Sequence, residues 1–324
     1  MFFEIEPFED NQTGVVLQFP TATGLTFVDD DKFLVLSFHE ENDNTIEPDG
    51  NLFVEMRSVS TPENIIEHIE LPLNANTNDL FWSELKYSAS AHALLLFHHN
   101  EYDVFFLNTE WGVFSRKTHR YPFQTKPMHI VVDTDHIYMN GVPLDGDVNQ
   151  VAVARTTIES EDFEILHIFE DFSSHFSVHA GYLVIPGTNS IIYNVESKEK
   201  YTYELQGEVK LSMKYFAVYR QETNNITFTV LENGNPTWVS FDIMSETWKK
   251  TSNDINVNFN IMVGASAYFS VFDEAFVIDM DLRTRIGDYD FVDHIIAMDK
   301  NKFVIKFEEG EDDPGGVHLV VFDQ

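Results

Sequence analysis

The amino-acid sequence predicts an all-β fold, and three observations support this prediction. Short apolar runs, rich in β-branched and aromatic residues, alternate with clusters of Asp, Asn, Gly and Pro along the chain of 324 residues. Helical periodicity is nearly absent. The chain is 43% hydrophobic and contains 29 Phe, so it has enough apolar material for a large core and is not expected to be disordered.

The apolar runs pair into hairpins of similar shape. Each consists of a run, a short polar turn and a second run, as in "LTFVDDDKFLVLSF". Asp29, Asp30 and Asp31 occupy the turn of this first hairpin, and Asp suits turns because it bonds its own main chain. We therefore expect a solvated turn there rather than a cation site. The second runs recur about every 45 residues and begin near Phe33, Leu94, Ile137, Tyr182, Phe216, Phe269 and Phe303.

A third run follows each hairpin. Its landmarks recur about every 44 residues, at Arg57, Asn108, Arg155, Asn194, Asp242, Asp279 and Asp323. Most copies continue into a fourth run, as in "EKYTYEL" (199–205) and "ETWKKTS" (246–252). Four strands per unit at this spacing are typical of the blades of a β-propeller.

The sequence therefore predicts a single closed β-propeller of seven four-stranded blades, or of eight if residues 207–250 hold an additional hairpin. The last copy stops after its third run, so a strand within residues 1–22 is expected to supply the missing strand and close the ring. One segment, "STPENIIEHIEL" (60–71), fits either a helix with Thr61 as N-cap or a strand. The predicted blades span approximately residues 23–74, 80–121, 127–170, 172–206, 207–252, 255–289 and 291–324.

Two turns between third and fourth runs resemble those of kelch and related propellers. In "VSFDIMSETWKK" (239–250) an apolar strand ends in Asp and a Trp follows after a turn, and "IIYNVESKEKYTY" (191–203) is a looser version. The paired glycines that end a kelch second strand are absent, and so are the Trp-Asp dipeptides of WD40-like propellers. The resemblance implies blade architecture and assigns no functional residue.

The composition limits the classes of partner. There are 20 Lys+Arg against 54 Asp+Glu, which gives a formal net charge of −34. Direct binding to nucleic acid or to a membrane surface is not expected, because both depend on cationic side chains, whereas basic protein segments would be attracted. The absence of Cys excludes disulfides and thiolate chemistry. The start "MFFEIEPFEDN" does not fit a signal peptide, so a cytoplasmic location is expected.

No catalytic or metal-binding motif is present, and no cofactor is expected. His98 and His99 are neighbours on one strand and face opposite sides, and His136 lies in a predicted turn, so we interpret these histidines as structural. Trp82 opens a first strand, where it would either anchor a ligand at the channel mouth or pack in the core.

Acidic loops suggest an interaction surface. In a closed ring the loops between second and third strands of blades 1 and 7 would be neighbours, and their charge would attract a cationic partner. The function favoured on this basis is a non-enzymatic protein-interaction module, or scaffold, that presents an acidic rim to a basic protein segment. The predicted rim consists of Glu40, Glu41, Asp43, Glu47, Asp49, Glu308, Glu309, Glu311, Asp312 and Asp313.

Two alternatives remain open. The chain could be a propeller enzyme, a hydrolase or lyase, with carboxylates at the central channel, and the candidates on first strands are Glu84, Asp133 and Asp293. It could also be a structural subunit of a larger assembly, which an exposed apolar patch would indicate.

Overall fold

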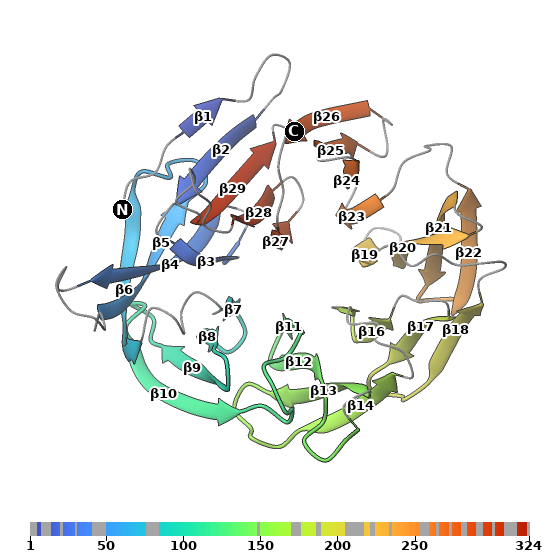
Figure 1. Cartoon of the computed structure of the whole chain (residues 1–324), viewed down its shortest axis with the longest axis horizontal. Coiled ribbons are helices and arrows are strands. Elements are labelled where there is room, and N and C mark those ends of the chain that lie inside the picture. The colour runs from blue at the N-terminus through green and yellow to red at the C-terminus, as the bar shows by residue number, and fades with distance from the viewer. Residues whose placement is uncertain are drawn as a thin grey trace. The chain divides into compact units, whose positions relative to one another are not determined.

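The structure is a computed structural model, and its described residues form strands β1 to β29 and no helix (Figure 1). No described helix could therefore cross a membrane. The strands divide into two compact units, one of Met1–Asp10, Gly14–Ile168 and Val292–Asp323 and one of Asn11–Thr13, Phe169–Phe291 and Gln324. The described residues are 5–7, 14–19, 22–29, 31–40, 50–75, 84–147, 150–169, 176–185, 189–204, 217–220, 224–232, 235–252, 259–263, 266–271, 274–279, 284–289, 294–299, 302–307 and 316–322.

In the first unit, three sheets are four-stranded antiparallel meanders, as the sequence predicts. The first strands of successive sheets are β3, β7 and β11, and β7 contacts both β3 and β11. The first sheet holds β3 (Ala22–Phe27), β4 (Lys32–Glu40), β5 (Gly50–Ser58) and β6 (Ile65–Ala75). The second holds β7 (Glu84–Ser88), β8 (Ala93–Phe97), β9 (Glu101–Leu107) and β10 (Val113–Arg120). The third holds β11 (His129–Asp133), β12 (His136–Gly141), β13 (Val151–Thr157) and β14 (Glu164–Phe169).

The fourth sheet of this unit joins the two ends of the chain. Strand β2 pairs antiparallel with β29, from Gly14 opposite Phe322 to Phe19 opposite Val317. The predicted pairing of an N-terminal strand with the last strand is thus present. The sheet has five strands rather than four, because β1 forms a further antiparallel pair with β2. Its order is β1 (Ile5–Pro7), β2 (Gly14–Phe19), β29 (Gly316–Phe322), β28 (Lys302–Phe307) and β27 (His294–Asp299).

The second unit contains three further four-stranded antiparallel sheets, and their first strands contact one another in the same way, β15 with β19 and β19 with β23. One sheet holds β15 (Ser177–His179), β16 (Tyr182–Ile185), β17 (Asn189–Asn194) and β18 (Lys200–Glu204). The next holds β19 (Ala217–Arg220), β20 (Asn225–Glu232), β21 (Asn235–Asp242) and β22 (Thr247–Ser252). The last holds β23 (Phe259–Val263), β24 (Ser266–Val271), β25 (Glu274–Asp279) and β26 (Thr284–Tyr289).

The structure corrects one predicted hairpin. The sequence analysis placed Phe216 in a second strand, but the residues directly after it, Ala217–Arg220, form the first strand β19 and pair with β20. The turn of this hairpin ends at Asn224, whose φ of 51° is left-handed, a conformation that Asn tolerates better than most residues. The described strands within residues 207–250 are those of one four-stranded sheet, without the additional hairpin that an eighth blade would need.

The segment that fitted either a helix or a strand is a strand. Strand β6 (Ile65–Ala75) pairs antiparallel with β5 and forms the edge of its sheet. Pro72 is tolerated there because an edge strand leaves one side unpaired, and the register shifts between Leu71 and Asn74.

The core lies between neighbouring sheets. In β8 every residue is buried, and alternate side chains point to opposite faces. Leu94 and Leu96 pack against the sheet of β3–β6, whereas Leu95 and Phe97 pack against the sheet of β11–β14. A central strand that contributes to two cores must be apolar throughout, which explains the run "ALLLF".

The aspartate turn of the first hairpin has the predicted structural role. The Asp29 carboxylate accepts hydrogen bonds from the backbone N–H groups of Asp31 and Lys32 at 2.9 and 2.8 Å. Asp31 accepts a hydrogen bond of 2.9 Å from the Ser58 hydroxyl, which ties the turn to β5. Asp30 lies outside the described residues.

Candidate active site

Four ionisable side chains meet where the first strands of two neighbouring sheets begin. Glu84 and Lys86 lie on β7, Lys126 lies in the connection that precedes β11, and His129 is the first residue of β11. The other ends of the two strands also adjoin, since the Ser88 hydroxyl donates a hydrogen bond of 2.6 Å to the carbonyl oxygen of Thr134. The two strands therefore run in the same direction, with these four residues, the Glu84 group, at one end.

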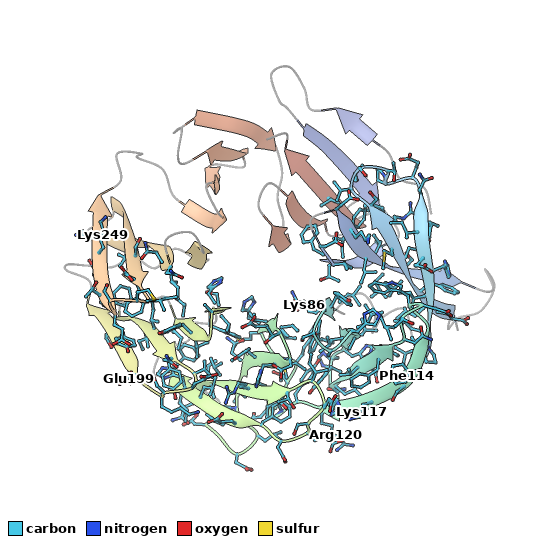
Figure 2. All side chains as sticks on the ribbon, turned by 180° about the vertical axis from the view of Figure 1, so that it is seen from behind. Lys86, Phe114, Lys117, Arg120, Glu199 and Lys249 are labelled. Atoms are coloured by element: carbon cyan, nitrogen blue, oxygen red, sulfur yellow. The ribbon has the colours of Figure 1, made fainter. Side chains whose placement is uncertain are left out.

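Glu84 and Lys86 form an ion pair. They are two residues apart on β7, so their side chains leave the same face of the strand. The Lys86 Nζ lies 2.7 Å from the Glu84 Oε1, and the side chains keep 20% and 31% of their surface exposed. Figure 2 shows Lys86 at the first-strand end of its sheet, away from Lys117 on β10 at the other edge. The pair is thus accessible to a solute.

The charges of this group shift one another's pKa values. Burial by itself would raise the pKa of the Glu84 carboxyl, but the ion pair with Lys86 and the nearby His129 and Lys126 hold that pKa below its ordinary value. Burial lowers the pKa of the Lys126 ammonium, the negative charge of Glu84 raises it, and the positive charge of Lys86 lowers it further, so the net shift is downward. Lys126 therefore releases its proton more readily than an exposed lysine.

The structure separates the acids that the sequence nominated. Glu84 belongs to the group, but Asp133 is the last residue of β11, at the end that adjoins Ser88. Strand β11 spans roughly 13 Å from first to last residue. Burial and the charge of Asp135 raise the pKa of Asp133, while His136 opposes the shift. Asp293 lies outside the described residues, and so does Trp82.

Two of the histidines singled out in the sequence, His98 and His136, have protein partners. His98 Nε2 lies 3.0 Å from the Asp103 carboxylate, and His136 Nδ1 lies 2.6 Å from Asp135. No three His, Asp or Glu side chains in the described part of the chain are arranged to hold a metal ion.

The predicted acidic rim falls almost entirely outside the described residues. Glu40 ends β4 opposite Gly50, and nothing is described of its side chain. The other residues of the rim are not among the described ones, so their meeting stays a prediction. They are Glu41, Asp43, Glu47, Asp49, Glu308, Glu309, Glu311, Asp312 and Asp313.

Sequence reasoning missed Lys86 and Lys126. It searched the first strands for carboxylates and overlooked cations, although the chain has only 20 Lys+Arg. Lys126 precedes His129 by three residues, directly before a first strand. Scarce basic residues at the start of first strands were the signal that could have found them.

Solved structures resemble this chain over nearly its whole length. One is an oligogalacturonate lyase from Vibrio parahaemolyticus, with a TM-score of 0.57, 9% identity and coverage of 99% of this chain and 96% of that chain. Another is an oligogalacturonate lyase in complex with manganese, with a TM-score of 0.59, 10% identity and coverage of 100% and 97%. The AfRom2 CNH domain has a TM-score of 0.52 and 9% identity and covers 94% of each chain. No protein-family model and no curated protein matches the chain.

These comparisons correct the function favoured from the sequence. The preference for a non-enzymatic scaffold is contradicted, because two of the structures that share the fold over nearly the whole chain are oligogalacturonate lyases. At 9 to 10% identity the likeness shows the fold alone, and an active site has to be argued from this chain's own residues. The chain has an all-β fold of antiparallel sheets with the architecture of a divergent β-propeller.

Proposed function

We propose that this chain is an enzyme, a lyase that cleaves an acidic polysaccharide of the oligogalacturonate type at the Glu84 group. One observation carries the proposal. In a chain with a net charge of −34, the cationic side chains of Lys86, Lys126 and His129 gather around a single carboxylate. Such a site suits a substrate with carboxylate groups, and oligogalacturonate lyases share the fold.

The geometry favours a lyase over a hydrolase. Glycoside hydrolases commonly use two carboxyl groups roughly 5 to 9.5 Å apart. Glu84 and Asp133 belong to opposite ends of adjoining strands, and among the described residues only Lys86, Lys126 and His129 act on the charge of Glu84, with no second acid. Elimination needs one base and a cation for the substrate carboxylate, and the Glu84 group offers both.

The roles follow from the charges. Lys126, after it has lost its own proton, takes the proton from the carbon next to the uronate carboxylate, a double bond forms between that carbon and its neighbour, and the bond from the neighbour to the glycosidic oxygen breaks. Lys86 and Lys126 stand close enough for their charges to interact, so Lys86 neutralises the substrate carboxylate as the proton leaves. His129 donates a proton to the departing oxygen. Glu84 holds Lys86 in place through their ion pair.

A divalent metal, such as the manganese held by one of the similar lyases, does not fit the described group. Two lysines beside one carboxylate repel a cation and offer a single oxygen-ligand side chain. No step above passes through a metal.

The test is the appearance of unsaturated product from polygalacturonate, followed by its ultraviolet absorbance. Lys126→Met should lower kcat roughly 100-fold to 10,000-fold, as expected for loss of a general base. Lys126→Arg should lower it equally, because a guanidinium keeps the charge but does not deprotonate. Lys249→Met is the matched control, since Lys249 is an exposed lysine on β22 (Figure 2). An active Lys126→Arg variant, or a wild-type protein inactive on every polyuronate, would contradict the proposal.

We further propose that the sheets are blades of one closed seven-bladed propeller with the blade ranges predicted from the sequence. Support comes from the pairing of β2 with β29 and from the repeated contact of first strands within each unit. Limited proteolysis tests this proposal: cleavage between blades should unfold the chain, whereas release of a stable folded fragment would contradict it.

A further inference from the structure

The connection between β10 and β11, residues 121–128, carries Lys126 to the Glu84 group, and it is held along its whole length. The Tyr121 hydroxyl donates a hydrogen bond of 2.8 Å to the carbonyl oxygen of His98. Phe123 is buried and packs so closely on Gly141 that a Cβ at residue 141 would lie 2.7 Å from the Phe123 Cγ. Only glycine leaves that space, so the approach of the connection to β12 is specifically built.

The middle of the connection is tied to the chain that follows β12. The Gln124 backbone N–H donates to the carbonyl oxygen of Val142 at 2.9 Å. Its side-chain amide donates to the carbonyl oxygens of Pro143 and Gly146 at 3.0 and 3.2 Å. Lys126 follows two residues later, so its backbone has little freedom to move.

Asn140 closes this series of anchors next to Lys126. It lies on β12 opposite His129 and is completely buried. Its side-chain oxygen accepts a hydrogen bond of 2.8 Å from the His129 backbone N–H, and its main-chain oxygen accepts one of 3.0 Å from the Met128 N–H. One buried residue thus accepts hydrogen bonds from two consecutive backbone amides at the point where β11 begins.

We propose that Asn140 is a positioning residue, which fixes the start of β11 so that Lys126 and His129 stand beside Glu84. This inference rests on the proposed function, because Lys126 is the proton acceptor only in that function. Asn140 is the residue of β12 that holds Lys126 in position. Replacing Asn140 by a residue without an acceptor removes the acceptor of the partly buried His129 N–H and leaves the space of a completely buried side chain. The connection would then shift, and Lys126 would leave the burial and the charges that distinguish it from an exposed lysine.

The test measures Lys126 itself rather than turnover. The folded protein is labelled briefly with acetic anhydride across a pH series, and mass spectrometry follows labelling at Lys126 and at the exposed Lys249. In the wild type the midpoint for Lys126 should lie below that for Lys249. In Asn140→Ala the difference between the two midpoints should be lost.

The control is Thr156→Val. Thr156 is a buried polar residue of the same sheet, opposite Ile137 on β12, and its hydroxyl donates within its own loop, to Thr157 and Ser160. This variant should leave the Lys126 midpoint unchanged even if it lowers the melting temperature. If Asn140→Ala does not fold, Asn140→Gln serves in its place, because it displaces the amide oxygen by one methylene group.

An Asn140→Ala or Asn140→Gln variant with the wild-type difference between midpoints would overturn the proposal. Labelling needs no substrate, so the two proposals fail separately. A wild-type protein that cleaves no polyuronate but responds to these substitutions refutes the proposed function alone.

Discussion

Two charged groups in the sheet of β7–β10 show how the same residue types serve different ends. Asp103 on β9 is 1% exposed, and its two oxygens accept hydrogen bonds from His98, from Arg116 Nε and Nη2 and from Thr118. Glu84 on β7 is 31% exposed and has one ion-pair partner, with two further cations nearby. The Asp103 carboxylate accepts its hydrogen bonds from protein groups and so stabilises the fold. Glu84 lies near more cations than it can neutralise, which leaves positive charge available to a ligand.

The largest expected effect on stability comes from Asp103→Asn. It leaves Arg116 and His98 beside a neutral amide in a buried place, so the free energy of unfolding should fall by about 3 kcal/mol. Urea denaturation at neutral pH measures this. A loss below about 1 kcal/mol would remove the distinction between the two groups, because Asp103 would then behave like a surface ion pair.

Asp103 should also contribute to the pH dependence of stability. Burial opposes ionisation of Asp103, but hydrogen bonds from His98, Arg116 and Thr118 lower its pKa to about 2. Because the folded pKa lies below the unfolded value of about 3.9, the contribution of Asp103 is full above pH 4 and is lost as pH falls toward 2. The melting temperature should therefore fall more steeply between pH 5 and pH 2 in the wild type than in Asp103→Asn. Equal slopes of melting temperature against pH would contradict this assignment.

A smaller loss of stability on acidification is expected at His119. This residue is 2% exposed on β10, stacks on Tyr102 with ring centroids 5.1 Å apart, and neither ring nitrogen has a hydrogen-bond partner in the described structure. Burial and Lys117 lower its pKa, while Glu161 and Asp103 oppose the shift. Its contribution is full above the unfolded pKa of about 6.5 and is lost as pH falls below that value.

His119→Phe keeps the ring stack and removes this titration. The melting temperature of the variant should change less than that of the wild type between pH 7 and 5. A wild-type melting temperature that is constant over this range would show that the imidazole is not held neutral by the fold.

The smallest effect on stability, and the sharpest contrast with Asp103, is expected for Glu84→Gln. The ion pair with Lys86 is partly exposed, so the free energy of unfolding should change by less than about 1 kcal/mol. The negative charge of Glu84 raises the pKa of Lys126, so its removal should move the rising limb of kcat/KM to lower pH. A rising limb that stays in place would remove Lys126 as the proton acceptor.

The strands were largely predictable because each apolar run has to serve two cores. Leu94 and Leu95 face different neighbouring sheets, and this demand appears in the sequence as a short, fully apolar run. The fifth hairpin was misplaced because "VKLSMKYFAVY" contains two apolar runs and a polar break, while the turn that the structure uses ends at Asn224. Apolarity alone does not say which of several polar breaks is the turn.

The candidate site was predictable only in part. Glu84 could be named because a first strand begins there, but two of its neighbours, Lys126 and His129, come from the next sheet and the connection before it. Lys126 is 42 residues further along the chain than Glu84, and its approach depends on Gly141 and Asn140, which the sequence marks by no motif. Such side-chain contacts arise from the packing of one sheet on the next.

The most direct measurement compares the turnover of polygalacturonate with that of its fully methyl-esterified form by the wild-type protein. A site built from Lys86, Lys126 and His129 should cleave the acidic polymer with a kcat/KM roughly 10-fold or more above that for the ester, because the ester lacks the charge that Lys86 binds. Equal turnover of both, or turnover of neither, would contradict the assignment of this group as the active site of a polyuronate lyase.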